Sequence, residues 1–430
     1  MTDPKSSEPE LRDREVMLKV PRTMAGSHNL TQAELLRERQ DPNRPLPARA
    51  ADYLKIRVFE WIWHYIRSRF GPKHEFLTYP GSGNDRGIYP LTADEGAPRA
   101  PVRVELVGDW GTGTRDAQRI AQLMVQRDPH FTVHLGDVYY VGTKKEIREN
   151  MLERVRWPLG SRGSFSLNSN HEMYARGFGY FKVLLPALGF RASGNDGTGQ
   201  RASFFCLRND HWAVIGLDTG YYSVGIPALE KIFKPSAKLH DRLLDWLKKD
   251  VRLQEDKQRG IILLSHHQYY SQWESHYERA ARQLSDLVNR PVMWFWGHEH
   301  RMAVYGAHAT KKGRLTVFGR CIGHGGMPIE DIKDLPRNDK KHRVGLVLYD
   351  ARRQTSIGDK NTPIGYNGFA ELVFKEDELE IGYHDSDNQY LLREVWRAGD
   401  GGRITGVSIE SKITDPGFVL YGSKLEDAIS

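Results

Sequence analysis

Residues 135–140 read Leu135-Gly136-Asp137-Val138-Tyr139-Tyr140. They overlap the end of the apolar run Phe131–Leu135, whose short length and β-branched residues predict a buried strand rather than a helix. A Gly-Asp pair after this strand places a carboxylate at the carboxyl edge of a sheet, where open α/β sheets bind their ligands. A single aspartate there carries little weight, so the interpretation depends on how the other predicted strands end.

Four further predicted strands are followed by side chains that bind metal ions. Their sequences are Gly108-Asp109-Trp110-Gly111, Ser169-Asn170-His171-Glu172, Ser265-His266-His267 and Gly297-His298-Glu299-His300. Oxygen donors and imidazoles at one sheet edge are what a pair of divalent or trivalent cations needs. Asp109 and Asp137 end neighbouring strands, so both can reach one ion and one of them can bridge to a second. Alternation along an extended chain points His298 and His300 to the same side and Glu299 away from it.

The composition is that of an ordinary globular protein, with 39% hydrophobic and 27% charged residues in a chain of 430. The net charge of +7 favours anionic ligands in general, without distinguishing phosphate esters from nucleic acid or acidic lipid. Both cysteines, Cys206 and Cys321, lie in apolar runs and are expected to be buried thiols. Their spacing indicates neither a zinc site nor a disulfide framework.

Strands alternate with helices from Pro101 onward, and strands predominate after Met302. This order predicts an α/β fold in which two sheets pack together with helices outside. We expect three regions along the chain. They are an N-terminal extension over 1–100, a main domain over 101–397 and a C-terminal tail over 398–430.

The N-terminal extension is expected to hold a loosely ordered arm, an amphipathic helix at about 48–70 and a linker. This helix is aromatic and basic, which allows contact with a membrane surface. Packing against the main domain is the favoured alternative, since Asp52 and Glu60 also lie on it. The absence of an apolar export signal after Met1 and of a long apolar run predicts a cytoplasmic protein without a transmembrane segment.

The order GDWG, GDVYY, SNHE, SHH and GHEH resembles the calcineurin-like metallophosphoesterase superfamily, and more narrowly its purple acid phosphatase branch. The resemblance covers about Arg103 to Glu394 and implies a four-layer αββα sandwich of two mixed sheets flanked by helices. Many members carry Asp-x-His in the first motif, whereas Trp110-Gly111 leaves no histidine there. Purple acid phosphatases also lack that histidine and use a tyrosine three residues after the bridging aspartate, which is Tyr140 in this chain.

Two metal ions are implied by this resemblance. The first is held by Asp109, Tyr140 and His300, Asp137 bridges, and the second is held by Asn170, His266 and His298. A phenolate is a hard anionic donor that suits Fe³⁺, so Tyr140 as a ligand implies iron paired with iron, zinc or manganese. The alternative for Tyr140 is an aromatic ring packed beside the site, and Tyr139 is expected to serve packing.

His171 is the expected acid catalyst, because it follows a metal ligand and an imidazole can protonate a departing alkoxide near neutral pH. Glu172 is expected to orient His171 and raise its pKa. Relatives commonly carry Gly-Asn-His at this place, whereas this chain has Ser169. If the position needs a positive φ, Ser169 strains the turn that places Asn170 and His171.

Three residues are expected to contact substrate: Asn170, His267 and His324. His267 follows a metal ligand, with a purely supporting role as its alternative. His324 lies in the Gly-rich loop 323–327, whose flexibility allows backbone to approach a phosphate, with a plain turn as the alternative.

The sequence therefore predicts a binuclear metal-dependent phosphoric ester hydrolase that acts on a small phosphorylated substrate. A phosphomonoesterase, in which hydroxide bridging the two metals attacks phosphorus, is favoured. A phosphodiesterase acting on nucleotides, nucleic acid or lipid head groups is the alternative within this class, although no nucleic-acid partner is expected. A non-catalytic protein that binds a membrane or a partner on the same fold is the alternative outside it.

Overall fold

The computed structural model describes residues 71–430 except 81–84, 95, 97–98, 192–198, 225–235, 330–335, 337–342 and 357–358. The predicted N-terminal arm and the amphipathic helix at 48–70 lie outside the described residues.

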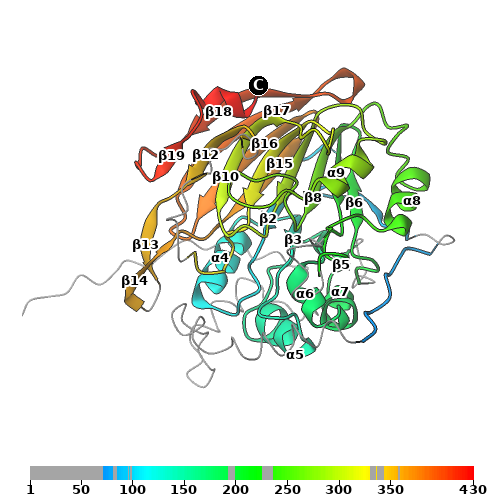
Figure 1. Ribbon diagram of the computed structural model, residues 1–430, viewed down its shortest axis with the longest axis horizontal. Coiled ribbons are helices and arrows are strands. Elements are labelled where there is room, and N and C mark those ends of the chain that lie inside the picture. The colour runs from blue at the N-terminus through cyan, green and yellow to red at the C-terminus, as the bar shows by residue number, and fades with distance from the viewer. Residues whose placement is uncertain are drawn as a thin grey trace, which may run out of the picture.

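Two large mixed sheets make up the centre of the protein (Figure 1). The nine-stranded sheet contains, in spatial order, β1 (Ile88–Pro90), β6 (Phe205–Arg208), β7 (Trp212–Gly216), β8 (Gly260–Ser265), β9 (Val292–Trp296), β11 (Val317–Ile322), β10 (Met302–His308), β12 (Leu346–Asp350) and β19 (Phe418–Leu420). The eight-stranded sheet contains β18 (Ile404–Ser411), β17 (Tyr390–Ala398), β16 (Glu378–Asp385), β15 (Gly368–Lys375), β2 (Val102–Val107), β3 (Phe131–His134), β4 (Gly163–Ser166) and β5 (Gly189–Phe190). A separate hairpin pairs β13 (Arg353–Ser356) with β14 (Asp359–Gly365).

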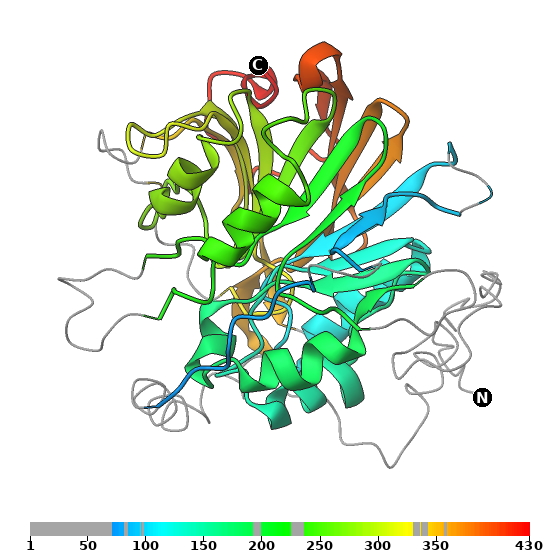
Figure 2. The same cartoon turned by 90° about the vertical axis from the view of Figure 1, so that its right-hand side faces the viewer.

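Helices cover the outer face of each sheet. The α-helices are α4 (Arg115–Gln126), α5 (Lys144–Ile147), α6 (Asn170–Tyr174), α7 (Leu185–Ala187), α8 (Asp241–Lys249) and α9 (Glu278–Leu284). Four further segments are π- or 3₁₀-helical: η1 (Arg148–Glu153), η2 (Tyr180–Leu184), η3 (Asp400–Gly402) and η4 (Leu425–Ala428). Figure 2 shows α8 and α9, in green, against the nine-stranded sheet.

The apolar strands are buried on both faces, as β9 illustrates. Its residues Met293 and Phe295 point into the core between the two sheets. Trp294 and Trp296 point to the other face, into the core that also holds apolar residues of α8 and α9. A strand covered on both faces needs a continuous apolar sequence, which is why these runs lack polar alternation. The result is the predicted sandwich of two sheets between helical layers.

The segment expected to be a C-terminal tail belongs to the sheets instead. Strand β18 pairs with β17 at the edge of the eight-stranded sheet, and β19 pairs with β12 at the edge of the nine-stranded sheet. The alternation of the sequence is weak here because most of β18 is exposed or half-buried, so the pattern does not stand out as a strand.

Parallel strands bring the motifs together at one edge. β2, β3 and β4 run parallel in one sheet, and β7, β8 and β9 run parallel in the other. The two groups meet through glycine backbone, since a Cβ added to Gly108 would lie 2.9 Å from the Gly297 Cα. Any larger residue at Gly108 would therefore push the two sheet edges apart.

A buried ion pair joins the sheets further along. Arg320 on β11 donates to the Glu394 carboxylate on β17, with an Nη2 to Oε2 distance of 2.7 Å, and neither side chain is exposed. Arg320 also donates to the backbone carbonyls of Tyr305 and Ala428, and Tyr383 donates to Glu394. The charges are thus fully hydrogen-bonded, which offsets the cost of removing them from water.

Replacement of Glu394 by glutamine should leave the buried Arg320 charge uncompensated. We expect Glu394→Gln to lower the free energy of unfolding by about 3 kcal/mol or more. Urea denaturation at neutral pH measures the loss. Glu380→Gln is the matched control, because Glu380 pairs with Lys375 and Arg393 at a half-exposed position and should cost less than about 1 kcal/mol. Equal urea midpoints for both variants would contradict the assignment.

Candidate metal centre

Two groups of potential metal ligands lie where the parallel strands end. Asp109, Asp137 and His300 form one group, in which the donor atoms lie within 4.8 Å of one another. The Tyr139 hydroxyl joins this group, at 2.8 Å from Asp109 Oδ1, 2.9 Å from Asp137 Oδ2 and 3.0 Å from His300 Nε2. The single proton of the Tyr139 hydroxyl cannot be shared with all three of these acceptor atoms. The group therefore has more lone pairs than protons, as a metal-binding site does.

The tyrosine at the carboxylates is Tyr139, whereas the sequence predicted Tyr140. Val138 forms a β-bridge with Gly111, and the Tyr139 N–H donates to the Gly111 carbonyl at 2.9 Å. These backbone contacts hold the turn at Tyr139, whose hydroxyl faces the Asp109 and Asp137 carboxylates. Tyr140 supplies its backbone carbonyl to His171. The geometry favours Tyr139 as the ligand.

The second group surrounds His266 Nε2. This atom lies 3.0 Å from Asn170 Oδ1, 3.2 Å from Asp137 Oδ1 and 3.2 Å from His298 Nδ1. The other ring nitrogen, Nδ1, lies 3.0 Å from the Leu135 carbonyl and must donate a proton to it. Burial lowers the pKa of His266 to about 3, so the ring is neutral and Nε2 carries a lone pair.

A cation fits this second group. The His266 lone pair faces two oxygens that have only lone pairs to offer, because Asn170 directs its Nδ2 to the Tyr174 hydroxyl at 3.2 Å. Asp137 Oδ1 receives no hydrogen bond from the described residues. Converging lone pairs repel one another unless a positive charge lies between them, and nitrogen and oxygen donors suit a transition metal. Asp137 contributes one oxygen to each group, as a bridging ligand does.

Three residues of the site have a left-handed backbone. The φ angles are 58° at Asp109, 76° at Asp137 and 67° at His298. Each follows a glycine at the end of a strand, and each conformation costs on the order of 1 kcal/mol or more for a non-glycine residue. The left-handed backbone turns these side chains away from the strand direction and toward the edge where the two sheets meet.

Residues 102–302 match one model of a known protein family. The model described as calcineurin-like phosphoesterase matches residues 102–302, which contain all of the ligand-type residues above. Residues 102–302 are therefore similar to calcineurin-like phosphoesterases.

Solved structures similar to this chain are distant in sequence. A purple acid phosphatase from yellow lupin (Lupinus luteus) is 15% identical with a TM-score of 0.42, over 71% of this chain and 54% of that one. GAP50, titled the anchor in the inner membrane complex of Plasmodium, is 15% identical with a TM-score of 0.43, over 73% and 90%. PhoD is 12% identical with a TM-score of 0.45, over 82% and 76%. The chain spans about half the length of the lupin protein, and no curated protein sequence matches it.

His171 lies beside the candidate metal ligands. Its Nε2 is 3.7 Å from Asp137 Oδ2, and its Nδ1 is 2.5 Å from the Tyr140 carbonyl. The carbonyl, rather than the predicted Glu172, thus orients the ring. His171 and Glu172 are consecutive in α6, and consecutive helical residues do not face each other. Glu172 is fully buried and accepts a hydrogen bond from Ser169 instead.

Ser169, which stands where relatives commonly carry glycine, has no strained backbone. Its φ is −130°, an extended conformation that any residue adopts. Its side chain accepts from the His171 N–H and so caps α6. Serine at the N-cap stabilises the short helix that carries Asn170 and His171.

His267 is buried at the site, and it is supported by two residues that the sequence analysis missed, Thr219 directly and Asp218 through the turn that carries Thr219. Thr219 Oγ1 lies 3.1 Å from His267 Nδ1, and Asp218 holds the turn that carries Thr219. Both follow β7, a parallel neighbour of β8. The signal was again an apolar strand ending in polar residues, Leu217-Asp218-Thr219, which lacks a ligand-type motif.

His324 does not share this environment. Only 2% of its surface is exposed, and its side chain packs against Gly368 of β15, whose modest size leaves room for the ring. Burial and the nearby Arg352 charge lower the pKa of His324 to about 3. The geometry favours the alternative of a structural histidine in a tight loop.

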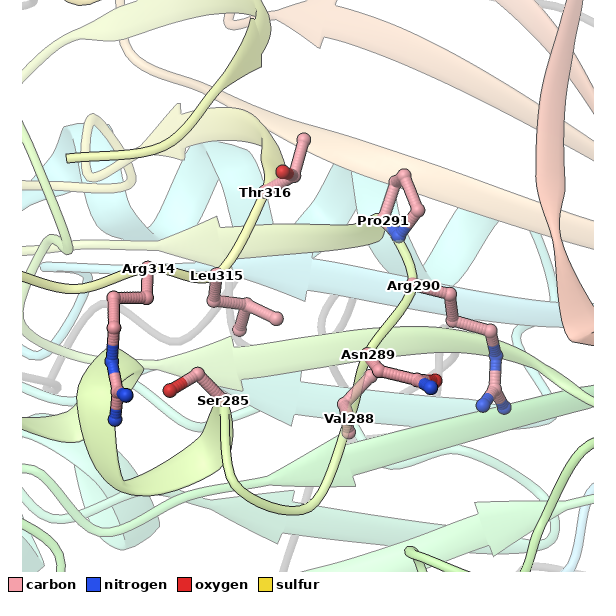
Figure 3. Close-up of a pocket in the computed structure, with 8 residues that line it drawn as sticks. All are labelled: Ser285, Val288, Asn289, Arg290, Pro291, Arg314, Leu315 and Thr316. Carbon is pink, nitrogen blue, oxygen red and sulfur yellow. The ribbon is translucent and has the colours of Figure 1, made fainter. Parts of the chain in front are cut away.

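A small surface pocket lies at the opposite ends of the strands (Figure 3). Its volume is about 190 Å³, and Arg290, Arg314 and Thr316 are among the residues that line it. These residues precede β9 and β11, whereas the metal ligands follow β8 and β9. The pocket is therefore separate from the candidate metal centre. In the described part of the chain no helix is both long and apolar enough to cross a membrane.

Metal binding should release a proton. Burial, together with the neighbouring Asp137 carboxylate, raises the pKa of Asp109 well above its usual value. The Asp109 carboxyl of the metal-free protein therefore binds a proton more tightly than an ordinary aspartate does, and a metal ion must displace that proton, so metal affinity should fall as the pH drops through the raised pKa. Titration calorimetry with Zn²⁺ or Mn²⁺ in buffers of different ionisation enthalpy measures the release.

Asp109→Asn should reduce the release by about one proton per chain. Glu172→Gln is the matched control, because burial also raises the pKa of Glu172, but its carboxylate contacts Ser169. An unchanged proton count in Asp109→Asn would contradict the assignment.

Proposed function

We propose that the protein is a binuclear metal-dependent phosphomonoesterase. One metal ion would be held by Asp109, Tyr139 and His300, the second by Asn170, His266 and His298, and both by Asp137. When bound, such a pair of ions supplies an activated water as nucleophile and neutralises charge at phosphorus. The single observation that carries the proposal is the convergence of lone pairs on His266 Nε2 and around Asp137.

His171 would act as the general acid. The His171 Nδ1–H donates a hydrogen bond to the Tyr140 carbonyl, so Nε2 is the atom that can give a proton to the departing oxygen. The side chain is 17% exposed, which leaves it accessible to a substrate at the edge of the ligand cluster. Its Nε2 lies 3.7 Å from Asp137 Oδ2, which supports a role beside the bound substrate rather than as a metal ligand.

The deciding experiment combines metal content, visible spectrum and activity of the purified chain. We expect two metal ions per chain and preference for an aryl phosphate over an aryl phosphodiester; preference for the diester would favour the phosphodiesterase alternative. If one ion is Fe³⁺, a phenolate ligand should give a visible absorption band.

The Tyr139→Phe variant should lose this visible band, and the Tyr140→Phe variant should keep it. The reverse pattern would restore Tyr140 as the ligand, and a colourless active enzyme would exclude iron–phenolate ligation.

His171→Gln should reduce turnover according to the leaving group. With an alkyl phosphate, whose alkoxide must be protonated, we expect kcat to fall about 10²–10⁴-fold. With 4-nitrophenyl phosphate, whose phenolate leaves without protonation, the loss should be much smaller. Stopped assays on the two substrates measure the difference, and metal content should be unchanged. An equal loss on both substrates would rule out the role of general acid.

A further inference from the structure

His267 raises a question that the proposed function leaves open. One of its nitrogens lies within 4.8 Å of nitrogens of His266 and His298, so the three histidines could all bind one ion. Its ring lies 4.7 Å from the His298 ring and 4.8 Å from the His266 ring, between centroids. A histidine at this position can be either a third nitrogen ligand or a hydrogen-bond donor to substrate.

The hydrogen bonds of Thr219 decide between these roles. Thr219 Oγ1 accepts from the His267 backbone N–H at 3.0 Å and lies 3.1 Å from His267 Nδ1. Only 1% of Thr219 is exposed, so its hydroxyl proton needs a hydrogen-bond acceptor. Within the described residues, His267 Nδ1 is the acceptor that its geometry offers. An Nδ1 that accepts leaves the proton of the neutral ring on Nε2.

The opposite tautomer would leave a buried group unsatisfied. If Nδ1 donated to Thr219, the threonine hydroxyl would keep a proton with no acceptor among the described residues. Buried donors without partners are rare in folded proteins because their desolvation is not compensated. The tautomer with hydrogen on Nε2 satisfies the hydroxyl, the ring and the backbone N–H together.

The surroundings hold this arrangement in place. Asp218 accepts from the Gly220 and Tyr221 N–H groups, at 2.9 and 2.8 Å, which fixes the turn that carries Thr219. The His267 carbonyl accepts from Ser265 Oγ at 2.8 Å, and the Tyr277 ring packs edge-on at 5.1 Å. Because Thr219 contacts both the backbone and Nδ1, Nε2 points away from the main chain.

We propose that Thr219 fixes the tautomer of His267, so that His267 presents an Nε2–H donor to a phosphoryl oxygen instead of acting as a metal ligand. Thr219 is then a positioning residue, and His267 contacts the substrate. The inference rests on the proposed function for the identity of the anion. It names His267 Nε2–H as the donor to the anion and Thr219 as the residue that fixes the tautomer of His267.

The tautomer itself can be measured without metal or turnover. In metal-free protein labelled with ¹⁵N-histidine, and with His267 assigned through His267→Gln, we expect the spectrum of a protonated Nε2 and an unprotonated Nδ1. Thr219→Ser should preserve this spectrum, and the isosteric Thr219→Val should populate both tautomers. A protonated Nδ1 in the parent protein overturns the inference, whatever the enzyme's activity.

The role toward the anion is tested by inorganic phosphate as a competitive inhibitor. His267→Ala should weaken phosphate binding about tenfold or more, the loss expected for a hydrogen bond to a charged group. His267→Gln should largely retain binding, because its amide N–H₂ lies near the position of Nε2–H. Thr219→Val should weaken phosphate binding and Thr219→Ser should not.

Metal analysis of the same variants separates the two roles. If His267 is a donor to substrate, both His267 variants should keep the parental number of metal ions and the parental metal affinity. A loss of one ion, or a tenfold lower metal affinity in both variants, would show that His267 is a ligand and overturn the inference. A parent protein that binds neither metal nor phosphate would refute the proposed function instead, while the tautomer measurement would still stand.

Discussion

The structure depends on the close approach of two glycine backbones where the sheets meet. Gly108 follows β2 and Gly297 follows β9, and neither position leaves space for a side chain. The Gly108 N–H donates to the Ile322 carbonyl, and the Gly297 N–H to the His266 carbonyl, so backbone hydrogen bonds tie the strand ends together. This contact brings carboxylates from one sheet within reach of imidazoles from the other, which neither sheet alone could achieve.

Several unfavourable contributions to the free energy of folding lie at this same edge, and the rest of the fold must compensate for them. Asp109 and Asp137 are buried carboxylates on neighbouring strands, and both have a left-handed backbone. The partners of these carboxylates include histidines, a tyrosine and a backbone amide. Strain and like charge of this kind are stabilised by a bound cation, which is why such costs concentrate at functional sites. The thick apolar core between the sheets supplies the stability that tolerates them.

Local sequence patterns predicted two packed sheets and the strand ends that carry the candidate ligands, but they did not predict contacts between segments far apart in the sequence. The apolar run of β9 and its terminal Gly297-His298 could be read directly. The spacing of the purple acid phosphatase motif indicates Tyr140, whereas the hydroxyl that lies at Asp109 and Asp137 belongs to Tyr139. The polar end of β7, Leu217-Asp218-Thr219, is visible in the sequence, but the contact of Thr219 with His267 depends on β7 lying beside β8, which the sequence alone does not reveal.

The position of β15 has a consequence for how the chain is made. In the finished sheet β2 lies between β3 and β15, and β15 pairs with it along five residues. Residues 102–107 leave the ribosome early, whereas residues 368–375 follow only after the whole ligand-bearing region has been synthesised. Until then β2, with its four apolar residues, has no β15 backbone to pair with on one side, and such an unpaired edge promotes aggregation. The sheet that carries Asp109 can therefore be completed only late in the synthesis of the chain.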